Sequence, residues 1–315
     1  MEHRAPTLGI DESIELAHAW IQRLADSQGI RVLFIKGPSL HLLDLRPFHI
    51  SSDVDIMVHP DDFPRMCATL EKAGWRPREA GFLLDHIAHH SRTYLSDRWP
   101  CDIDIHRRFP GFLTAQEEVF EILWEDRTVL RYADHDCTTT GRNGSALVLA
   151  LHALRSLAQS TRHNQELEYL LSAPFTISEL QELGRLASRT GCTEPLEAIL
   201  AQLNAPSHRD KAPLDIGALR DWKVRTDVRE NGIGAYAWLK LVLDAPLSNK
   251  PTVLWRAIWP TDSDLTLHHP DLPSDPAARN RIRRKRLISG IRALPHVVRS
   301  IVRNRRAGGD TPQHL

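Results

Sequence analysis

The stretch "ISSDVDIMVHPDD", residues 50–62, places two carboxylates inside an otherwise apolar run. Successive side chains on a strand point to opposite faces, so Asp53 and Asp55 share one face while Val54 and Ile56 share the other. The apolar residues indicate an interior strand, where two neighbouring carboxylates repel each other unless a partner neutralises them. A divalent cation would resolve this conflict, because Mg²⁺ is usually held by one or two carboxylates together with substrate phosphates.

A second alternating segment, "CDIDIH" at residues 101–106, repeats the pattern. On a strand, Asp102, Asp104 and His106 would share a face. If this strand neighbours the first, three or four carboxylates point at one place. Two metal ions held there could clamp the attacking and leaving oxygens of a phosphoryl-type displacement.

A turn with the sequence "KGPS", residues 36–39, precedes the first acidic strand. It follows the apolar run at residues 30–35, which reads as a buried strand, and it opens a short helix. Such a turn can present backbone N–H groups to phosphate. A solitary D-x-D is most often a solvated strand face. The apolar flanks, this turn and the second D-x-D together favour a catalytic reading.

The elements around these motifs predict an α+β fold, with a mixed sheet flanked by helices. Period-3.6 patterns predict helices at residues 11–27 and 60–74, and apolar alternation around a polar turn predicts a hairpin at residues 92–109. From about Ser145 four helical patterns follow, and residues 251–276, rich in Pro and Asp, read as an extended connector. We therefore expect a strand-bearing domain at 1–142, a helical domain at 143–250, and a connector with a basic helical tail at 251–315.

The charge of the chain is balanced but unevenly placed. The 315 residues hold 40 basic and 40 acidic side chains, and eleven of the basic ones lie between Arg279 and Arg306 without a single acid. The rest of the chain, which we call the body, holds the other 29 basic residues and all 40 acidic ones, so the body carries a net negative charge. An apolar stripe on the tail helix favours docking or plain solvation, with an anionic partner as the second reading. The tail lacks interleaved aromatic residues for base stacking.

The cysteines and the apolar runs indicate a cytoplasmic protein without a transmembrane segment. Four cysteines, at positions 67, 101, 137 and 192, have neither metal-knuckle nor redox spacing. The longest uninterrupted apolar run, Ala146–Leu151, is far shorter than the roughly 20 residues that span a bilayer. The acidic residues near the N-terminus do not fit a signal peptide.

Taken together, "FIKGPSL", "SSDVDIMVHPDDFPRMCATLEKAGW" and "DIDIH" resemble the bacterial uncharacterised nucleotidyltransferases of the DNA polymerase β-like superfamily. The resemblance covers about residues 30–110, with a looser similarity in "LHALRS" and "IWPTDSDL". It implies a transferase that moves an NMP group from an NTP, such as ATP, to an acceptor hydroxyl and releases pyrophosphate. The acceptor itself is not indicated by the sequence.

The resemblance also implies roles for individual residues. Lys36, Gly37 and Ser39 would bind the nucleotide, with Ser39 contacting a triphosphate oxygen and Lys36 neutralising phosphate charge. Asp53 and Asp55 would bind Mg²⁺ or Mn²⁺.

Asp104 would be the third carboxylate, which binds metal and helps to deprotonate the acceptor. Asp102 lies on the same predicted face and is the second choice for that role, because Asp104 heads the D-x-H match with His106.

Two departures from the family pattern leave an alternative open. Pro38 separates Gly37 from Ser39, and Arg46 lies seven residues before Asp53, where related chains have an arginine about four residues before. The first departure motivates a rival reading, in which the chain is a catalytically silent module that binds a partner protein. A nucleic-acid binder driven by the basic tail is a further alternative.

The histidine cluster "HIAHH" suggests a possible metal site of another kind. His86, His89 and His90 would share a helical face and could hold zinc, but no fourth ligand is evident. We therefore prefer the interpretation that these histidines lie at the surface or beside the acceptor pocket and bind no metal.

Overall fold

The computed structural model describes residues 8–79, 90–155, 161–206, 212–231, 235–268 and 275–307. The chain forms two compact units, of which the first comprises Met1–Arg78 with His90–Trp222 and the second Glu79–His89 with Lys223–Leu315. The domain boundaries expected from the sequence, after residues 142 and 250, stay predictions. All the residues expected to bind metal or nucleotide lie in the first unit.

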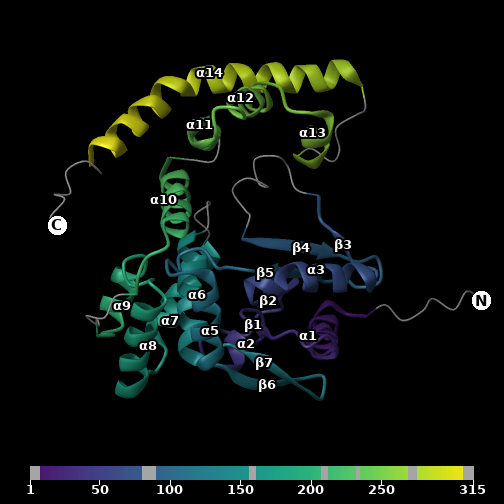
Figure 1. Ribbon diagram of the computed structural model, residues 1–315, viewed down its shortest axis with the longest axis vertical. Coiled ribbons are helices and arrows are strands. Elements are labelled where there is room, and N and C mark those ends of the chain that lie inside the picture. Colours follow the sequence, from purple (N-terminus) through teal and green to yellow (C-terminus); the bar gives the residue numbers. More distant parts are fainter. Residues whose placement is uncertain are drawn as a thin grey trace, which may run out of the picture. The chain divides into compact units, whose positions relative to one another are not determined.

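The first unit begins with alternating helices and strands and continues with helices (Figure 1). Its first part contains α1 (Ile10–Ser27), β1 (Val32–Phe34), α2 (Ser39–Leu42), β2 (Asp53–Val58), the 3₁₀ turn η1 (Pro60–Asp62), α3 (Phe63–Lys72), β3 (Arg76–Pro77), β4 (Ser91–Leu95) and β5 (Asp102–His106). Its second part contains α5 (Gln116–Glu125), β6 (Thr128–Tyr132), β7 (His135–Thr139), α6 (Arg142–Arg155), α7 (Thr161–Ser172), α8 (Ile177–Arg189) and α9 (Glu197–Gln202).

Within the described residues the strands form one seven-stranded mixed sheet, in the order β3-β4-β5-β2-β1-β7-β6. β2 pairs parallel to β5 and antiparallel to β1, while β1 pairs parallel to β7. β4 and β5 form the antiparallel hairpin expected from residues 92–109. The α+β architecture predicted from the sequence, with a mixed sheet flanked by helices, is confirmed.

The sheet separates two apolar cores, and β2 contributes to both. Val54, Ile56 and Val58 pack with residues of α1 and α3, so they line the first core. Met57 lies on the opposite face and packs with α5 and α6 in the second core. Asp53 and Asp55 point to the same face of β2 as Met57. On that face the N-terminal half of β2 is therefore acidic, and Met57 near its C-terminal end packs into the second core.

The β6–β7 hairpin and α5 complete the sheet and its helical layer, although the sequence patterns had not indicated them. Thr139 of β7 pairs with Phe34 of β1, and its hydroxyl donates to the Phe34 carbonyl at 2.7 Å. α6 to α9 correspond to the four helical patterns recognised after residue 145. The helices place their buried leucines in the second core.

In its described residues, the second unit contains the C-terminal part of α10 and four further helices. They are α10 (Ile216–Asn231), α11 (Ala235–Asp244), α12 (Lys250–Ile258), α13 (Asp262–His268) and α14 (Pro276–Ala307). Within this unit α14 packs against α11 and α12, and Pro295 lies inside α14. In the described part of the chain, no helix combines the length and the apolar character that crossing a bilayer requires.

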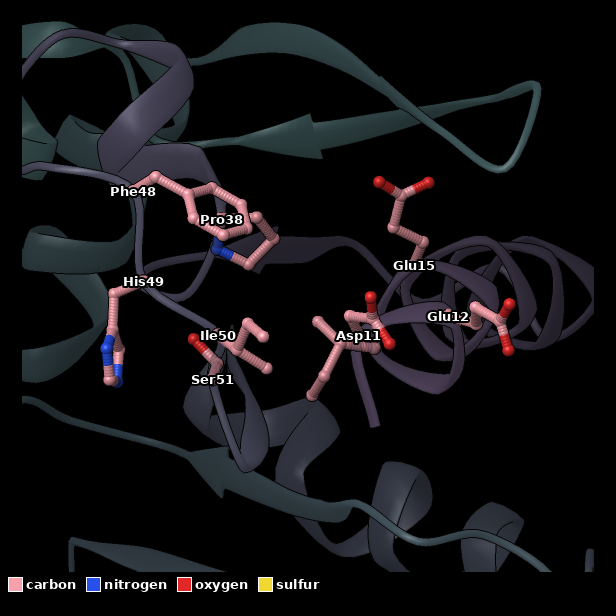
Figure 2. A pocket seen from close by; sticks show the side chains of 9 residues that line it. Asp11, Glu12, Glu15, Pro38, Phe48, His49, Ile50 and Ser51 are labelled. Carbon is pink, nitrogen blue, oxygen red and sulfur yellow. The ribbon is translucent and has the colours of Figure 1, made fainter. Parts of the chain in front are cut away.

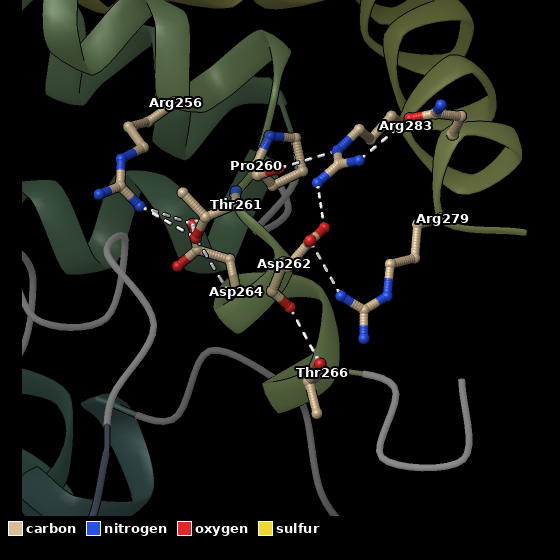
Figure 3. Close-up of polar contacts among 9 residues, drawn as sticks. Arg256, Pro260, Thr261, Asp262, Asp264, Thr266, Arg279 and Arg283 are labelled. Carbon is tan, nitrogen blue, oxygen red and sulfur yellow. Dashed lines mark hydrogen bonds and ion pairs between the residues drawn. The ribbon is translucent and has the colours of Figure 1, made fainter. Parts of the chain in front are cut away.

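The prediction of an extended connector at residues 251–276 is wrong, because α12 and α13 lie there. Pro251 stands in the first turn of α12, where proline is tolerated. The α13 N-terminus is capped reciprocally: the Thr261 hydroxyl accepts from the Asp264 N–H at 3.3 Å, and the Asp264 carboxylate accepts from the Thr261 N–H at 3.1 Å. Figure 3 shows Arg279 and Arg283 of α14 reaching Asp262 at 3.0 and 2.6 Å.

The outward side of α14 is basic and partly apolar. Arg281, Arg284 and Lys285 are exposed, and so are Ile288 and Ile291, at 50 % and 62 %. Of these two, Ile291 belongs to the apolar stripe that the sequence predicted on this helix, so that stripe includes an exposed side chain. An anionic partner for this helix stays a prediction.

The two-faced burial of β2 can be tested with a nearly isosteric substitution. Val54 is fully buried, so Val54→Thr places a hydroxyl in the α1–α3 core without a partner. We expect the free energy of unfolding to fall by about 1–3 kcal/mol, measured by urea denaturation. Val129→Thr, on a strand position that is 57 % exposed, is the control and should change stability by less than about 0.5 kcal/mol. Equal effects at both positions would contradict the burial pattern.

Candidate functional site

The register of two parallel strands brings the acidic residues together. β2 and β5 pair Asp53 with Asp102, Asp55 with Asp104, and Met57 with His106. Paired residues on adjacent strands point to the same side of a sheet. The second D-x-D therefore lies directly beside the first, as the sequence pattern had suggested.

His106 joins Asp55 and Asp104 in one cluster. Its Nε2 lies 2.9 Å from Asp55 Oδ1 and 3.1 Å from Asp104 Oδ2, and its ring is fully buried. One atom from each of these three residues lies within 4.8 Å of the others, an arrangement that could hold a metal ion. The Thr93 hydroxyl donates to the other oxygen of Asp104 at 3.3 Å, which fixes that carboxylate from the β4 side. Sequence alternation had placed His106 on this face without assigning it to the cluster.

Lys36 adds a second cation to the cluster. Its ammonium lies 2.6 Å from Asp55 Oδ1, the same oxygen that receives His106. The two side chains of this ion pair are 11 % and 4 % exposed, so the pair is largely shielded from water. The sequence had suggested a phosphate contact for Lys36, and its proximity to Asp55 was not anticipated.

The electrostatics of the cluster favour its charged form. Burial acts to raise the pKa of Asp55, but Lys36 and His106 outweigh burial and hold that pKa well below its usual range. Burial likewise opposes ionisation of Asp104, but the charge and hydrogen bond of His106 together with the charge of Lys36 lower the pKa of Asp104 overall. Burial acts to lower the pKa of His106, yet Asp104 and Asp55 raise it overall. The two carboxylates and His106 thus each favour the charged form of the other.

The other two predicted acids are placed differently. Asp53 lies one pair further along β2 and is partly exposed, and both its burial and the charge of Asp55 raise its pKa. Asp102 forms an ion pair with Arg78 and is not a member of the Asp55–Asp104–His106 cluster. Of the two candidates for the third carboxylate, Asp104 is thus the one that the structure brings to Asp55.

The turn after β1 is built from a left-handed glycine and a buried arginine. Gly37 has φ of +74°, a conformation that favours glycine. The Arg46 guanidinium donates to the Gly37 carbonyl at 2.9 Å and lies 3.4 Å from the Glu166 carboxylate of α7. Burial lowers the pKa of Arg46. The altered spacing of Arg46 had put its role in doubt, and the structure assigns it to holding this turn.

Ser39 is oriented into the turn itself. Its side chain is fully buried, and its hydroxyl donates to the Lys36 carbonyl at 2.8 Å. A contact between Ser39 and a triphosphate oxygen would require this hydroxyl to change partner.

His18 of α1 lies beneath the turn and was not identified from the sequence. Its Nδ1 lies 2.7 Å from the Ile14 carbonyl, and its ring stacks on Phe34 with centroids 4.6 Å apart. Burial lowers its pKa to about 4, so the ring is neutral at physiological pH. A side chain at Gly37 would meet the His18 Nε2 at 3.8 Å, which places this histidine directly below the glycine.

A cavity of about 290 Å³ opens beside the same turn. Figure 2 shows Asp11, Glu12 and Glu15 of α1 on one side of it, and Pro38 and Phe48 on the other. Ser51, two residues before Asp53, also lines it. The cavity thus connects the glycine turn with the start of the acidic strand.

The predicted histidine cluster is represented by His90 alone, because His86 and His89 lie outside the described residues. The His90 ring is 5.9 Å from the His106 ring, between centroids. His90 therefore neighbours the carboxylate cluster.

The raised pKa of Asp53 leads to a pH-dependent prediction. In metal-free buffer, Asp53→Asn removes an ionised carboxylate that burial and Asp55 disfavour, so the variant should unfold at a higher temperature at pH 7. The gain should be no more than about 4 °C. Because the folded-state pKa is raised, the gain should disappear below about pH 3.9, where Asp53 is protonated in both states.

Thermal melts between pH 3 and pH 8 measure this effect. Asp134→Asn, at a side chain that is 96 % exposed, is the control and should show no such dependence. A lower melting temperature for Asp53→Asn at pH 7 would contradict the electrostatic account.

Comparison with known proteins found a family model and a solved structure that are similar to this chain. The profile of a family described as "Uncharacterised nucleotidyltransferase" matches residues 14–206, which include the glycine turn and the Asp55–Asp104–His106 cluster. A crystal structure of an antigenic nucleotidyltransferase-like protein from Paracoccidioides brasiliensis is also similar, with 14 % identity and a TM-score of 0.37. That match covers 64 % of this chain and 96 % of the other. No curated protein matches the sequence. Since the family profile spans more than half of the chain, this protein belongs to the family of uncharacterised nucleotidyltransferases.

Proposed function

We propose that this protein transfers an NMP group from an NTP to an acceptor hydroxyl, with release of pyrophosphate, in a reaction that depends on Mg²⁺ or Mn²⁺. The observation that carries the proposal is the Asp55–Asp104–His106 cluster on two paired strands of a chain of this family. Two carboxylates and an imidazole, all of types that can ligate metal, come together there, and Lys36 next to the glycine turn contacts one of the carboxylates. The identity of the NTP and of the acceptor is left open.

The donor set fits a divalent cation. Carboxylate oxygens from Asp55 and Asp104 suit Mg²⁺ and Mn²⁺. His106 would either stay protonated beside them as a counterion or, after losing its Nε2 proton, add a nitrogen ligand that suits Mn²⁺ better than Mg²⁺. Asp53 lies on the same face of β2 and adds a further carboxylate at the open end. When bound, the metal would neutralise phosphate charge and polarise the phosphoryl group that is transferred.

The side chains of the protein position the reactants. Lys36 and the N–H groups of the Gly37 turn would bind the triphosphate, and Arg46 keeps the turn in place through the Gly37 carbonyl. Asp104, fixed by Thr93 and His106, would accept the proton of the acceptor hydroxyl. Such positioning and charge neutralisation account for most of the catalysis in phosphoryl transfer.

The cavity shown in Figure 2 is the space that we assign to the acceptor. Small-molecule sites usually occupy about 300–1,000 Å³, and this cavity of about 290 Å³ lies just below that range, so it suits a small acceptor. Its lining includes Ser51, which lies two residues before Asp53 in the chain. An acceptor held there would have its hydroxyl close to the acidic strand.

A silent nucleotidyltransferase-fold module that binds a partner is the second candidate function. The observation that favours it is the presence of Lys36 and His106, which already neutralise Asp55 and Asp104 without a metal. A charge-balanced cluster can be purely structural. The two candidates differ in whether the cluster binds a metal–nucleotide complex.

Isothermal titration with Mn²⁺ and each of the four NTPs separates these candidates. We expect the wild type to bind at least one NTP in the presence of Mn²⁺ and not in EDTA. Asp55→Asn removes a metal ligand and should weaken that binding at least about tenfold, a loss typical of a disturbed metal site. Asp102→Asn is the matched control, since Asp102 pairs with Arg78, and it should bind nearly as well as the wild type.

The selected NTP then serves in an acceptor screen that measures pyrophosphate release. Absence of Mn²⁺-dependent binding for all four NTPs would refute the transferase and leave the partner-binding module. Equal losses in Asp55→Asn and Asp102→Asn would show that the site is centred elsewhere on the sheet.

A further inference from the structure

We propose that Lys36 is an exchangeable counterion, which occupies Asp55 in the metal-free protein and must leave Asp55 before a divalent cation can bind there. In this role Lys36 opposes binding of free metal, and it moves to the triphosphate when metal and nucleotide arrive together. Lys36 thus makes metal binding conditional on nucleotide. The inference rests on the proposed function, because it concerns the same site.

The contacts of Asp55 show the competition directly. Asp55 Oδ1 receives Lys36 Nζ at 2.6 Å and His106 Nε2 at 2.9 Å. An oxygen that already accepts two charged donors has little capacity left for a metal ion. A cation bound there would also lie within a few ångströms of the Lys36 ammonium, and like charges repel strongly in a site shielded from water. Metal and Lys36 therefore compete for one atom.

Of the two counterions, Lys36 is the one that can move. The His106 ring is fully buried, and its centroid lies 5.7 Å from that of Phe109 and 5.9 Å from that of His90. Lys36 retains 11 % exposure and has a flexible four-carbon stem. A buried ring packed among other rings has no comparable freedom. The cluster thus combines a fixed cation with a mobile one.

The destination of Lys36 follows from its position in the chain. It immediately precedes Gly37, whose turn would bind the triphosphate, so the backbone at Lys36 need not move for its ammonium to reach that group. The triphosphate also supplies the negative charge that replaces Asp55 as partner. Nucleotide binding therefore removes the obstacle to metal binding, and by reciprocity metal increases nucleotide affinity.

Substitution of Lys36 separates this role from a purely structural one. Lys36→Met should bind free Mn²⁺ at least about tenfold more tightly than the wild type, measured by electron paramagnetic resonance of unbound Mn²⁺. The same variant should bind the Mn²⁺ complex of the selected NTP more weakly, because the phosphate contact is lost. In EDTA its melting temperature should fall, since Asp55 loses a partner, and Mn²⁺ should restore it.

Two further variants serve as controls. Lys36→Arg keeps the positive charge and should keep the weak binding of free Mn²⁺. Lys72→Met removes an exposed lysine of α3 and should leave both affinities unchanged. If Lys36→Met does not fold, Lys36→Gln removes the same charge with a polar side chain.

The possible results distinguish this inference from the proposed function. Unchanged or weaker binding of free Mn²⁺ by Lys36→Met, with normal binding of the Mn²⁺–NTP complex by the wild type, would overturn the exchange and leave the transferase proposal standing. Failure of both wild type and variant to bind Mn²⁺ in any form would overturn both. Tighter binding of free Mn²⁺ with weaker binding of the complex supports the exchange.

Discussion

The ion pairs on Asp55 are the interaction on which the rest of the site depends. A buried carboxylate is tolerated only when charged or polar groups compensate it, and here the compensation comes from the turn after β1 through Lys36 and from β5 through His106. Both donors reach Asp55 because β2 lies between β1 and β5 in the sheet. The order of these three strands therefore determines which cations can neutralise Asp55. A change of register by one residue would turn Asp55 into the apolar α1–α3 core.

The helical layer takes part in the site through Arg46. This arginine connects the Gly37 carbonyl with Glu166 of α7, and Glu166 also pairs with Arg162 at 3.1 Å. The glycine turn is thus held from below by His18 of α1 and from the side by α7. Since each contact lies within the first compact unit, the geometry of the turn depends on the sheet and on the helices after residue 142 together.

Local periodicity predicted β1, β2 and the β4–β5 hairpin, the helices α1, α3 and α6 to α9, and the shared face of the acids, because these depend only on residues close in sequence. It could not predict which acids meet which cations. Asp102 and Asp104 are equivalent by alternation, and in the structure they differ in their partners, because Asp102 pairs with Arg78 whereas Asp104 contacts His106. Arg46 and Glu166 are 120 residues apart. The helices at residues 250–268 were missed for another reason. The Pro and Asp content of residues 251–276 was read as an extended connector, although Pro251 stands in a first helical turn and Thr261 and Asp264 form a reciprocal cap.

The charge balance of the cluster supports two opposite readings, and the unequal burial of its cations favours one of them. A module that retains the acids only for stability gains most when both counterions are fixed, because a mobile partner loses side-chain entropy on pairing. In this protein one counterion is fixed by packing, and the other is a lysine with residual exposure beside a glycine turn. A removable cation next to buried carboxylates is useful where another cation has to enter. This asymmetry is the physical reason for preferring a metal-dependent transferase to a silent fold.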